Sequence, residues 1–262
     1  ILGIEYPILL AGMGGASVPA LAAAVSNAGG LGVLGAAACS PDQLRSWIRQ
    51  TRELTDKPFG VDTLLPASVR RGSAPQSGGA PENPMALLGE SQQFTRDFME
   101  REHLPEVDAA MAMRAAGAPE MGKGGPQLFS REFFEAQMEV VIEEKVPVYA
   151  AGLGNPGPWM DRLHANGTKV MAVIGKVKHA QQVVDSGIDM IVAQGHDGGG
   201  HNSPIGTFSL IPQVVDAVGD RVPVIGAGGI ADGRGVAAAM MLGALGAWVG
   251  TAFLATEEAG IE

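Results

Sequence analysis

The sequence predicts an α/β protein whose eight parallel strands, each followed by a helix, close into a (β/α)8 TIM barrel. Three observations support this prediction. Short apolar runs alternate with helical patterns eight times along the chain, as expected for such a fold. The apolar runs lack polar alternation, which is typical of strands buried on both faces. The length of 262 residues suits one barrel. A doubly wound open sheet is the alternative.

One repeated pattern defines the strand–helix unit. Each copy has a glycine that ends a helix, a few polar or small residues, a short apolar run and another glycine. The clearest copies are residues 26–36, 164–175, 184–195 and 216–229. A glycine just past a helix adopts the left-handed conformation without strain, so we expect positive φ angles at these helix ends.

The expected strands follow in order along the chain. They lie near residues 7–12, 31–36, 58–64, 147–152, 169–174, 189–194, 222–227 and 247–252. Helical patterns fill most of the gaps. The clearest are residues 40–54, for which Ser40 is the candidate N-cap, and residues 129–144, for which Ser130 is.

Residues 235–255 carry no charge for 21 positions, which is long enough for a membrane span. Gly243 and Gly246 interrupt the run, and its second half is rich in strand-forming residues. We therefore expect a buried helix, a tight turn and a buried strand here, and no membrane partner.

One segment of about 60 residues breaks the repeat after the third strand. Residues 67–128 are rich in glycine, proline and charge, so residues 1–66 and 129–262 form the predicted barrel. The insertion is either a disordered linker or a lid, because a loop after a strand's carboxyl end lies over the barrel mouth. Short helices are expected near 93–103 and 106–116. The two chain ends look trimmed.

The charge and cysteine content narrow the class of protein. The formal net charge is −10, so nucleic acid and anionic membranes are unfavourable partners. Cys39 is the one cysteine, which excludes an intramolecular disulfide and a multi-cysteine metal site. No metal is therefore expected. A single thiol and the lack of a visible signal peptide favour the cytoplasm.

Two loops near the end of the chain indicate phosphate binding. In such barrels, the loops after strands seven and eight often hold a phosphate. The first loop contains Ala227, Gly228 and Gly229, and the second contains Gly250 and Thr251. Their backbone N–H groups are unobstructed, and the helix beginning near Asp232 points its positive end the same way. Ordinary tight turns are the alternative.

Six stretches now carry a family resemblance. They are YPILLAGMGG, AVSNAGGLGVLGA, KPFGVDTLLP, IVAQGHDGGGH, VPVIGAGGIADGRG and WVGTAF. In this order they resemble FMN-dependent nitronate monooxygenases, formerly called 2-nitropropane dioxygenases, and the related flavin-dependent enoyl-ACP reductases. The resemblance covers most of residues 1–66 and 145–255, and it does not cover 67–128.

The resemblance implies an FMN site at the barrel mouth. Residues expected to face the isoalloxazine ring are Ala11, Gly12 and Met13, with Gln194 at the polar edge of the flavin and His201 beside the ring or the substrate. Residues expected near the phosphate are Gly198, Gly199, Gly200, Ala227, Gly228, Gly229, Gly250 and Thr251. For Gln194, a core amide is the alternative.

Two departures from the family pattern matter. Asp62 follows "FGV", where the family usually has asparagine, and an ionised carboxylate there would disfavour the reduced, anionic flavin. Nitronate monooxygenases carry a catalytic histidine at the end of strand four, where this chain has Gly152. The nearby GLGNPG and RLHANG stretches resemble the enoyl reductases instead, which places His164 at the position of their histidine.

These observations leave three functions open. The chain is an FMN-dependent oxidoreductase that reduces an unsaturated acyl thioester with NAD(P)H, or a true nitronate monooxygenase that uses O₂. In the first case His201 or His164 handles the proton. A phosphate-sugar isomerase or aldolase is the third, with Lys176 and Asp62 as its candidate groups. The substrate is a small molecule or an acyl thioester, and a homodimer is allowed.

Overall fold

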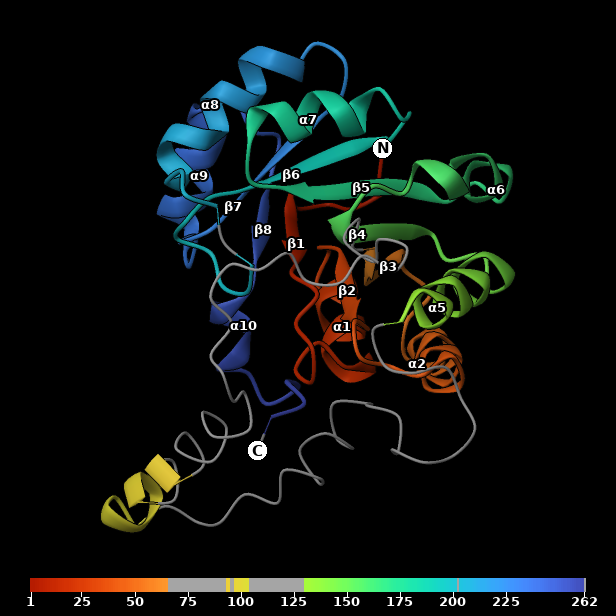
Figure 1. Ribbon diagram of the computed structural model, residues 1–262, viewed down its shortest axis with the longest axis vertical. Helices are drawn as coiled ribbons and strands as arrows, with labels where there is room; N and C mark the ends of the chain where they lie inside the picture. The colour runs from red at the N-terminus through yellow and green to blue at the C-terminus, as the bar shows by residue number, and fades with distance from the viewer. Residues whose placement is uncertain (66–92, 95–96, 104–129, 202, 262) are drawn as a thin grey trace, which may run out of the picture.

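The computed structural model describes residues 1–65, 93–94, 97–103, 130–201 and 203–261. Eight parallel strands form one sheet in the order β1-β8-β7-β6-β5-β4-β3-β2. A bridge between Leu9 and Leu31 joins the first strand to the second and closes the sheet into a barrel (Figure 1). The predicted (β/α)8 architecture is confirmed.

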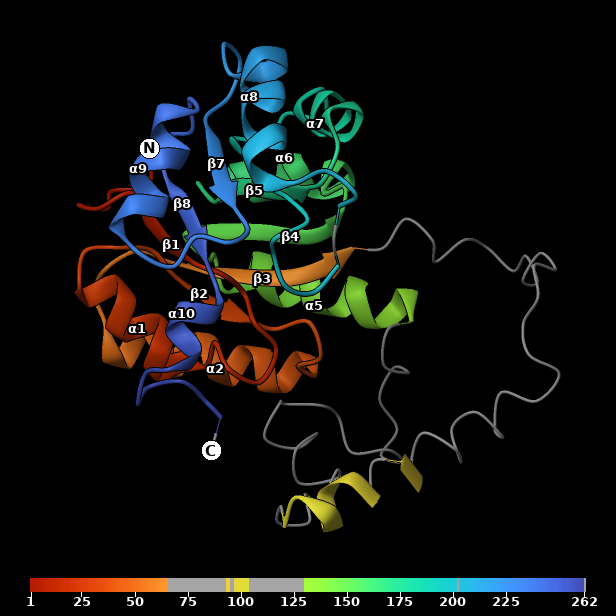
Figure 2. The same cartoon turned by 90° about the vertical axis from the view of Figure 1, so that its left-hand side faces the viewer.

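All eight expected strands are present. They are β1 (Ile8–Leu10), β2 (Gly32–Gly35), β3 (Phe59–Leu65), β4 (Val148–Gly154), β5 (Lys169–Ile174), β6 (Met190–Gln194), β7 (Val224–Ala227) and β8 (Ala247–Val249). The helices surround them, with α1, α2 and α5 on the opposite side of the barrel from α7 and α8 (Figure 2). They are α1 (Pro19–Asn27), α2 (Pro41–Leu54), α5 (Arg131–Glu143), the 3₁₀ turn η1 (Gly157–Trp159), α6 (Met160–Ala165), α7 (Val177–Val184), α8 (Thr207–Val218), α9 (Gly233–Met241) and α10 (Thr251–Leu254).

The two predicted helix caps are confirmed. Ser40 Oγ accepts a hydrogen bond from the Gln43 N–H at the start of α2. Ser130 Oγ accepts one from the Phe133 N–H at the start of α5. Each bond satisfies one of the amide groups that a helix leaves unpaired at its beginning.

The helix-ending glycines follow the expected pattern in three units out of four. Gly29, Gly167 and Gly187 have φ angles of 92°, 78° and 89°. Gly219 does not, because it keeps a helical φ of −65° and its N–H bonds the Val215 carbonyl. The expectation of a left-handed glycine is therefore wrong at the end of α8, where the chain turns with helical geometry instead.

The uncharged run at 235–255 contains most of α9, a turn at Gly243 with a φ of 96°, and the buried strand β8. The expected turn and buried strand are confirmed, but the expected buried helix is wrong, because α9 buries only Ala239 and leaves Met240 and Met241 exposed at the surface of the barrel. Within the described part of the chain, no helix is both long and apolar enough to cross a membrane.

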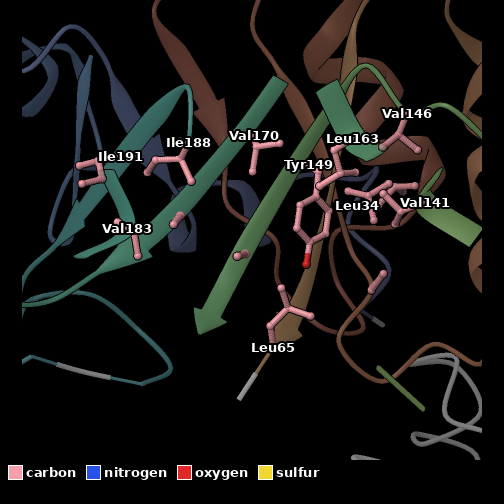
Figure 3. Packing of buried hydrophobic residues seen from close by; sticks show 14 of the residues in the cluster. Leu34, Leu65, Val141, Val146, Tyr149, Leu163, Val170, Val183, Ile188 and Ile191 are labelled. Carbon is pink, nitrogen blue, oxygen red and sulfur yellow. The ribbon is translucent and has the colours of Figure 1, made fainter. Parts of the chain in front are cut away.

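The core has two layers, one on each side of the sheet. The inner layer fills the barrel with Leu9, Leu31, Val33, Val148, Ala150, Met171, Met190, Val192, Ile225, Ala227 and Trp248. The outer layer lies between the strands and the helices, where Tyr149 packs near Leu34 and Leu163 (Figure 3). Its hydroxyl pairs with Thr63 Oγ1 at 2.8 Å, so the buried phenol remains hydrogen-bonded.

The insertion lies largely outside the described residues. Residues 93–94 and 97–101 are helical, within the helix predicted near 93–103. The helix predicted near 106–116, and with it the choice between a linker and a lid, lies outside the described ranges.

Candidate active site

The carboxyl ends of the eight strands meet at one end of the barrel, which we call the mouth. Side chains alternate across the sheet, so the residue two positions beyond each inner-layer residue also points inward. At the mouth the inward positions are small on five strands, which carry Ala11, Gly35, Gly152, Ala227 and Gly250, whereas β3, β5 and β6 carry Asp62, Val173 and Gln194 there. The layers below carry leucine, valine, methionine and tryptophan. The barrel is therefore filled below, and the floor of its mouth is low on the five strands with small residues.

The three consecutive glycines after β6 differ in what a side chain at each position would meet. A Cβ on Gly198 would lie 2.9 Å from Gln194 Cγ, and Gly200 has a φ of 71°. Gly199 has neither constraint, because a Cβ there would meet nothing within 4 Å, and the same space is open beside Gly200. The backbone at Gly199 and Gly200 is thus bare toward open space, as a ligand-binding loop requires.

Gln194 holds this glycine loop. Its Nε2 donates to the Gly199 carbonyl at 2.9 Å and to the His201 carbonyl at 3.4 Å. Farther along, Asp197 Oδ2 accepts from the Thr207 N–H at 2.7 Å, which lowers the pKa of Asp197. Ser203 Oγ donates to the Gly175 carbonyl at the end of β5. The loop is therefore fixed to β6, to the start of α8 and to the end of β5.

The loops after β7 and β8 continue the mouth next to the glycine loop after β6. Gly228 and Gly229 have φ angles of 105° and 69°. A Cβ on Gly228 would lie 2.5 Å from Thr207 Oγ1 and 2.9 Å from the Gly198 nitrogen, so the two glycine loops pack directly together. Gly250 lies next to Ala11, since a Cβ on Gly250 would be 3.5 Å from the Ala11 Cβ.

The start of α9 differs from expectation. Asp232 Oδ1 accepts from the N–H groups of Arg234 and Gly235 at 2.9 and 3.2 Å. Two of the amide groups that the sequence offered to a phosphate are therefore already bonded within the chain. Any anion at this side of the mouth would depend on the loop amides rather than on this helix end.

Asp62 is the buried carboxyl group of the mouth. It points into the barrel from β3 and is 8% exposed, and its Oδ1 has no hydrogen-bond partner among the residues that the structure describes. Burial raises its pKa well above the ordinary value, and the backbone N–H of Gly152 offsets only part of this effect. Asp62 is thus held as the neutral acid over a wider pH range than an exposed aspartate.

A cavity of about 590 Å³ opens at the carboxyl ends of β4, β5 and β6. Its wall includes Gly152, Asn155, Val173, Gln194 and Ser203. Three basic residues also line it, namely Lys176, His179 and His201. None of the described lining residues is a carboxylate. In a chain with a net charge of −10, this wall favours an anionic ligand.

The structure places His164 far from the mouth. Helix α6 runs back along the barrel, and His164 lies in its last turn. Its Nε2 pairs with Asp189 Oδ2 at 3.0 Å, and Asp189 Oδ1 pairs with Lys169 Nζ at 2.9 Å. Asp189 and Lys169 stand at strand starts, which are at the opposite end from the mouth. This placement does not support the predicted role of His164 in catalysis.

Most of the other predicted site residues lie in two groups at the mouth. Ala11, Gly12, Met13 and Gly250 adjoin one another, Gln194 contacts the Gly198–His201 loop, and Gly228 contacts the same loop from β7. No role was assigned from the sequence to Asn155, Val173, Ser203 or His179. The signal available was their place at or beyond the carboxyl ends of strands four to six, where a barrel puts its functional loops.

The fold and site define a TIM-barrel protein with a glycine-lined ligand site at the carboxyl ends of its strands. A family model described as nitronate monooxygenase matches residues 1–262, and the chain belongs to this family. It is 34% identical over 272 residues to "Probable nitronate monooxygenase" of Staphylococcus saprophyticus, across 99% of this chain and 68% of that protein.

Two solved structures are also similar. FabK from Thermotoga maritima is 36% identical with a TM-score of 0.71, across 100% of this chain and 63% of FabK. Nitroalkane oxidase from Streptomyces ansochromogenes is 32% identical with a TM-score of 0.72, across 99% of this chain and 69% of the oxidase. The chain thus spans about two-thirds of the length of its relatives.

Proposed function

We propose that this chain forms the catalytic barrel of an FMN-dependent oxidoreductase that reduces an unsaturated acyl thioester, with NAD(P)H as the electron source. The observation that carries this proposal is Gly152, which lines the cavity where the family resemblance places the histidine base of nitronate monooxygenases. Without that base, removal of a proton from a nitroalkane is disfavoured. The similarity to FabK supports the reductase assignment.

The mouth fits a flavin in three respects. Its cavity has a volume within the range of about 300–1,000 Å³ that small-molecule sites occupy. Gly199 and Gly200 leave their backbone open toward the ligand side. Asp62 Oδ1 is a buried polar atom without a partner in the described part of the chain, as expected where a ligand supplies the partner.

The proposal assigns the parts of the cofactor to named residues. Gly199, Gly200, Gly228, Gly229, Gly250 and Thr251 would hold the phosphate, while Ala11, Gly12, Met13 and Ala227 would lie under the ring. The Gln194 amide group already donates to the loop, so its carbonyl oxygen is the atom left to accept from the flavin. When bound, FMN supplies hydride exchange at N5.

The basic wall of the cavity would orient the substrate. Lys176 and His179 stand three positions apart at the start of α7, so they lie on one face of the helix. Opposite them, His201 follows the glycine loop. The positive charge of Lys176 would attract an anionic group on the substrate and hold it in one direction over the mouth. A homodimer is compatible with this arrangement.

True nitronate oxidation with O₂ is the second candidate, and the similarity to nitroalkane oxidase favours it. Lys176, the Schiff-base candidate of the isomerase or aldolase alternative, does line the cavity. Membership of the nitronate monooxygenase family nevertheless favours redox chemistry.

Three measurements test the proposal. The purified protein should be yellow, and mass spectrometry of the released cofactor should identify FMN. NAD(P)H should then bleach the flavin, and an enoyl thioester should restore its colour under nitrogen. Oxygen uptake with a neutral nitroalkane should be slow. A colourless protein would reject the flavin assignment, and fast uptake with the nitroalkane would favour the oxidase instead.

A further inference from the structure

The floor of the mouth contains one buried ionisable group, the carboxyl group of Asp62. Asp62 lies between the bare backbones of Gly12 and Gly152, and a Cβ would lie 2.4 Å from Oδ2 at the first glycine and 2.5 Å from Oδ1 at the second. Side chains are therefore excluded on both sides of the carboxyl group. Two glycines and an unpartnered Oδ1 are costly features for a residue that only fills space.

Asp62 does not line the cavity itself, and it reaches the cavity wall only through its contact with Gly152. Gly152 lines the cavity wall, and its missing side chain would point at Asp62 Oδ1. The carboxyl group therefore occupies the space that a side chain at position 152 would take. An acid–base group carried by β4 and the present Asp62 exclude each other sterically.

We propose that the Asp62 carboxyl group, which β3 carries, supplies the proton in the reduction of the acyl thioester. It would take the place of an acid–base side chain at position 152 on β4. This inference rests on the proposed reductase function. The raised pKa of the carboxyl is consistent with it, because a donor must be protonated at the working pH.

The step balances as follows. One alkene carbon of the enoyl thioester accepts a hydride from the reduced flavin, and the pair of π electrons moves to the carbon next to the thioester carbonyl. The O–H bond of Asp62 breaks, and a C–H bond forms at that carbon. Asp62 is left as the carboxylate, and a proton from water restores it before the next turnover.

The side chains around Asp62 leave it as the candidate proton donor at the floor of the mouth. On β4, Tyr149 has its pKa raised by burial, with a smaller contribution from the charge of Asp62, and it points to the outer layer. The neighbouring backbone from β1 and β2 carries no ionisable side chain at Gly12, Met13 or Gly35. The cavity adds Lys176, His179 and His201, of which His201 is the competing donor.

The experiment separates the two half-reactions of the FMN-loaded protein. Asp62→Asn keeps the shape of the side chain and removes the acidic proton. It should retain FMN and its reduction by NAD(P)H, while reoxidation by an enoyl thioester slows by about 10²–10⁴-fold. The wild-type reoxidation rate should fall as the pH rises through the pKa of Asp62, and that dependence should vanish in the variant.

Control variants keep the outcome unambiguous. Asp161→Asn, an exposed change on α6, should match wild type in both half-reactions. Asp62→Ala combined with Gly152→His, which exchanges the carboxyl for a group on β4, should recover part of the lost rate.

Each possible failure has a separate meaning. Absent FMN or absent reduction in the wild type would reject the proposed function. Intact reoxidation in Asp62→Asn, or loss confined to His201→Ala, would overturn the role of Asp62. If Asp62→Asn loses activity because it unfolds, the cofactor-free variant would show a lower urea midpoint. The variant that combines Asp62→Ala with Gly152→His then decides. If that variant recovers none of the lost reoxidation rate, the inference is overturned.

Discussion

Gly228 and Thr207 pack so closely that a side chain cannot come between them. A Cβ on Gly228 would lie 2.5 Å from Thr207 Oγ1, and the φ of 105° is strained for any other residue. Thr207 Oγ1 donates to the Ala227 carbonyl at 3.2 Å. This contact fixes the loop after β7 against the start of α8, and through Gly198 against the glycine loop after β6.

Gly228→Ala should therefore destabilise the fold itself. A strained backbone costs about 1–3 kcal/mol, and the steric contact with Thr207 adds to this. Urea unfolding of the cofactor-free protein should show a lower midpoint. An unchanged midpoint would mean that the two loops are not locked together.

Gly199→Ala is the matched contrast. A Cβ at Gly199 meets nothing within 4 Å, and the residue has no positive φ, so the unfolding free energy should stay within about 0.5 kcal/mol of wild type. Fluorescence titration of the cofactor-free variant with FMN should show weaker binding, because the added methyl group enters the ligand space. Equal affinity would remove Gly199 from the proposed site.

The pH dependence of stability reports on Asp62 without any cofactor. Its folded pKa is raised above the ordinary 3.8 by burial, so the folded state binds the proton more tightly than the unfolded state. The stabilising contribution is complete below pH 3.8 and is lost as the pH rises through the folded pKa. Asp62→Asn does not titrate, so its unfolding free energy should gain on wild type over that window. A constant difference would contradict the raised pKa.

Much of the site was predictable from sequence because glycine reports on backbone geometry. The eight strands and the caps Ser40 and Ser130 follow from local patterns, which act over a few residues. His164 shows the limit of this reasoning. Its place in a matched motif suggested catalysis, whereas its position depends on the direction of α6 and on Asp189, which is 25 residues away. Likewise, the overlap of Asp62 with the space beside Gly152 arises only when β3 and β4 pair.

His164→Ala should consequently affect stability rather than turnover. Its ring is partly exposed and pairs with Asp189, so its loss should cost at most about 1 kcal/mol. FMN content and both flavin half-reactions should equal those of wild type. A large loss of reoxidation would show that a residue at the far end of the barrel takes part in catalysis.

Lys176 provides the last test, which concerns the charge of the substrate. It lines the cavity together with His179 and His201, and it makes no ion pair in the described part of the chain, unlike Lys169, which pairs with Asp189. An unpaired cation beside a cavity without carboxylates should act on an anionic substrate by simple attraction, which weakens with salt.

Lys176→Gln should raise KM for an anionic acyl thioester by about fivefold to tenfold, or roughly 1 kcal/mol, with little change in kcat. Lys178→Gln, an exposed change two residues away that does not line the cavity, is the control. Steady-state kinetics at low and high salt would decide between the two outcomes, since an effect shared equally by both variants would indicate general attraction to the surface instead of binding in the cavity.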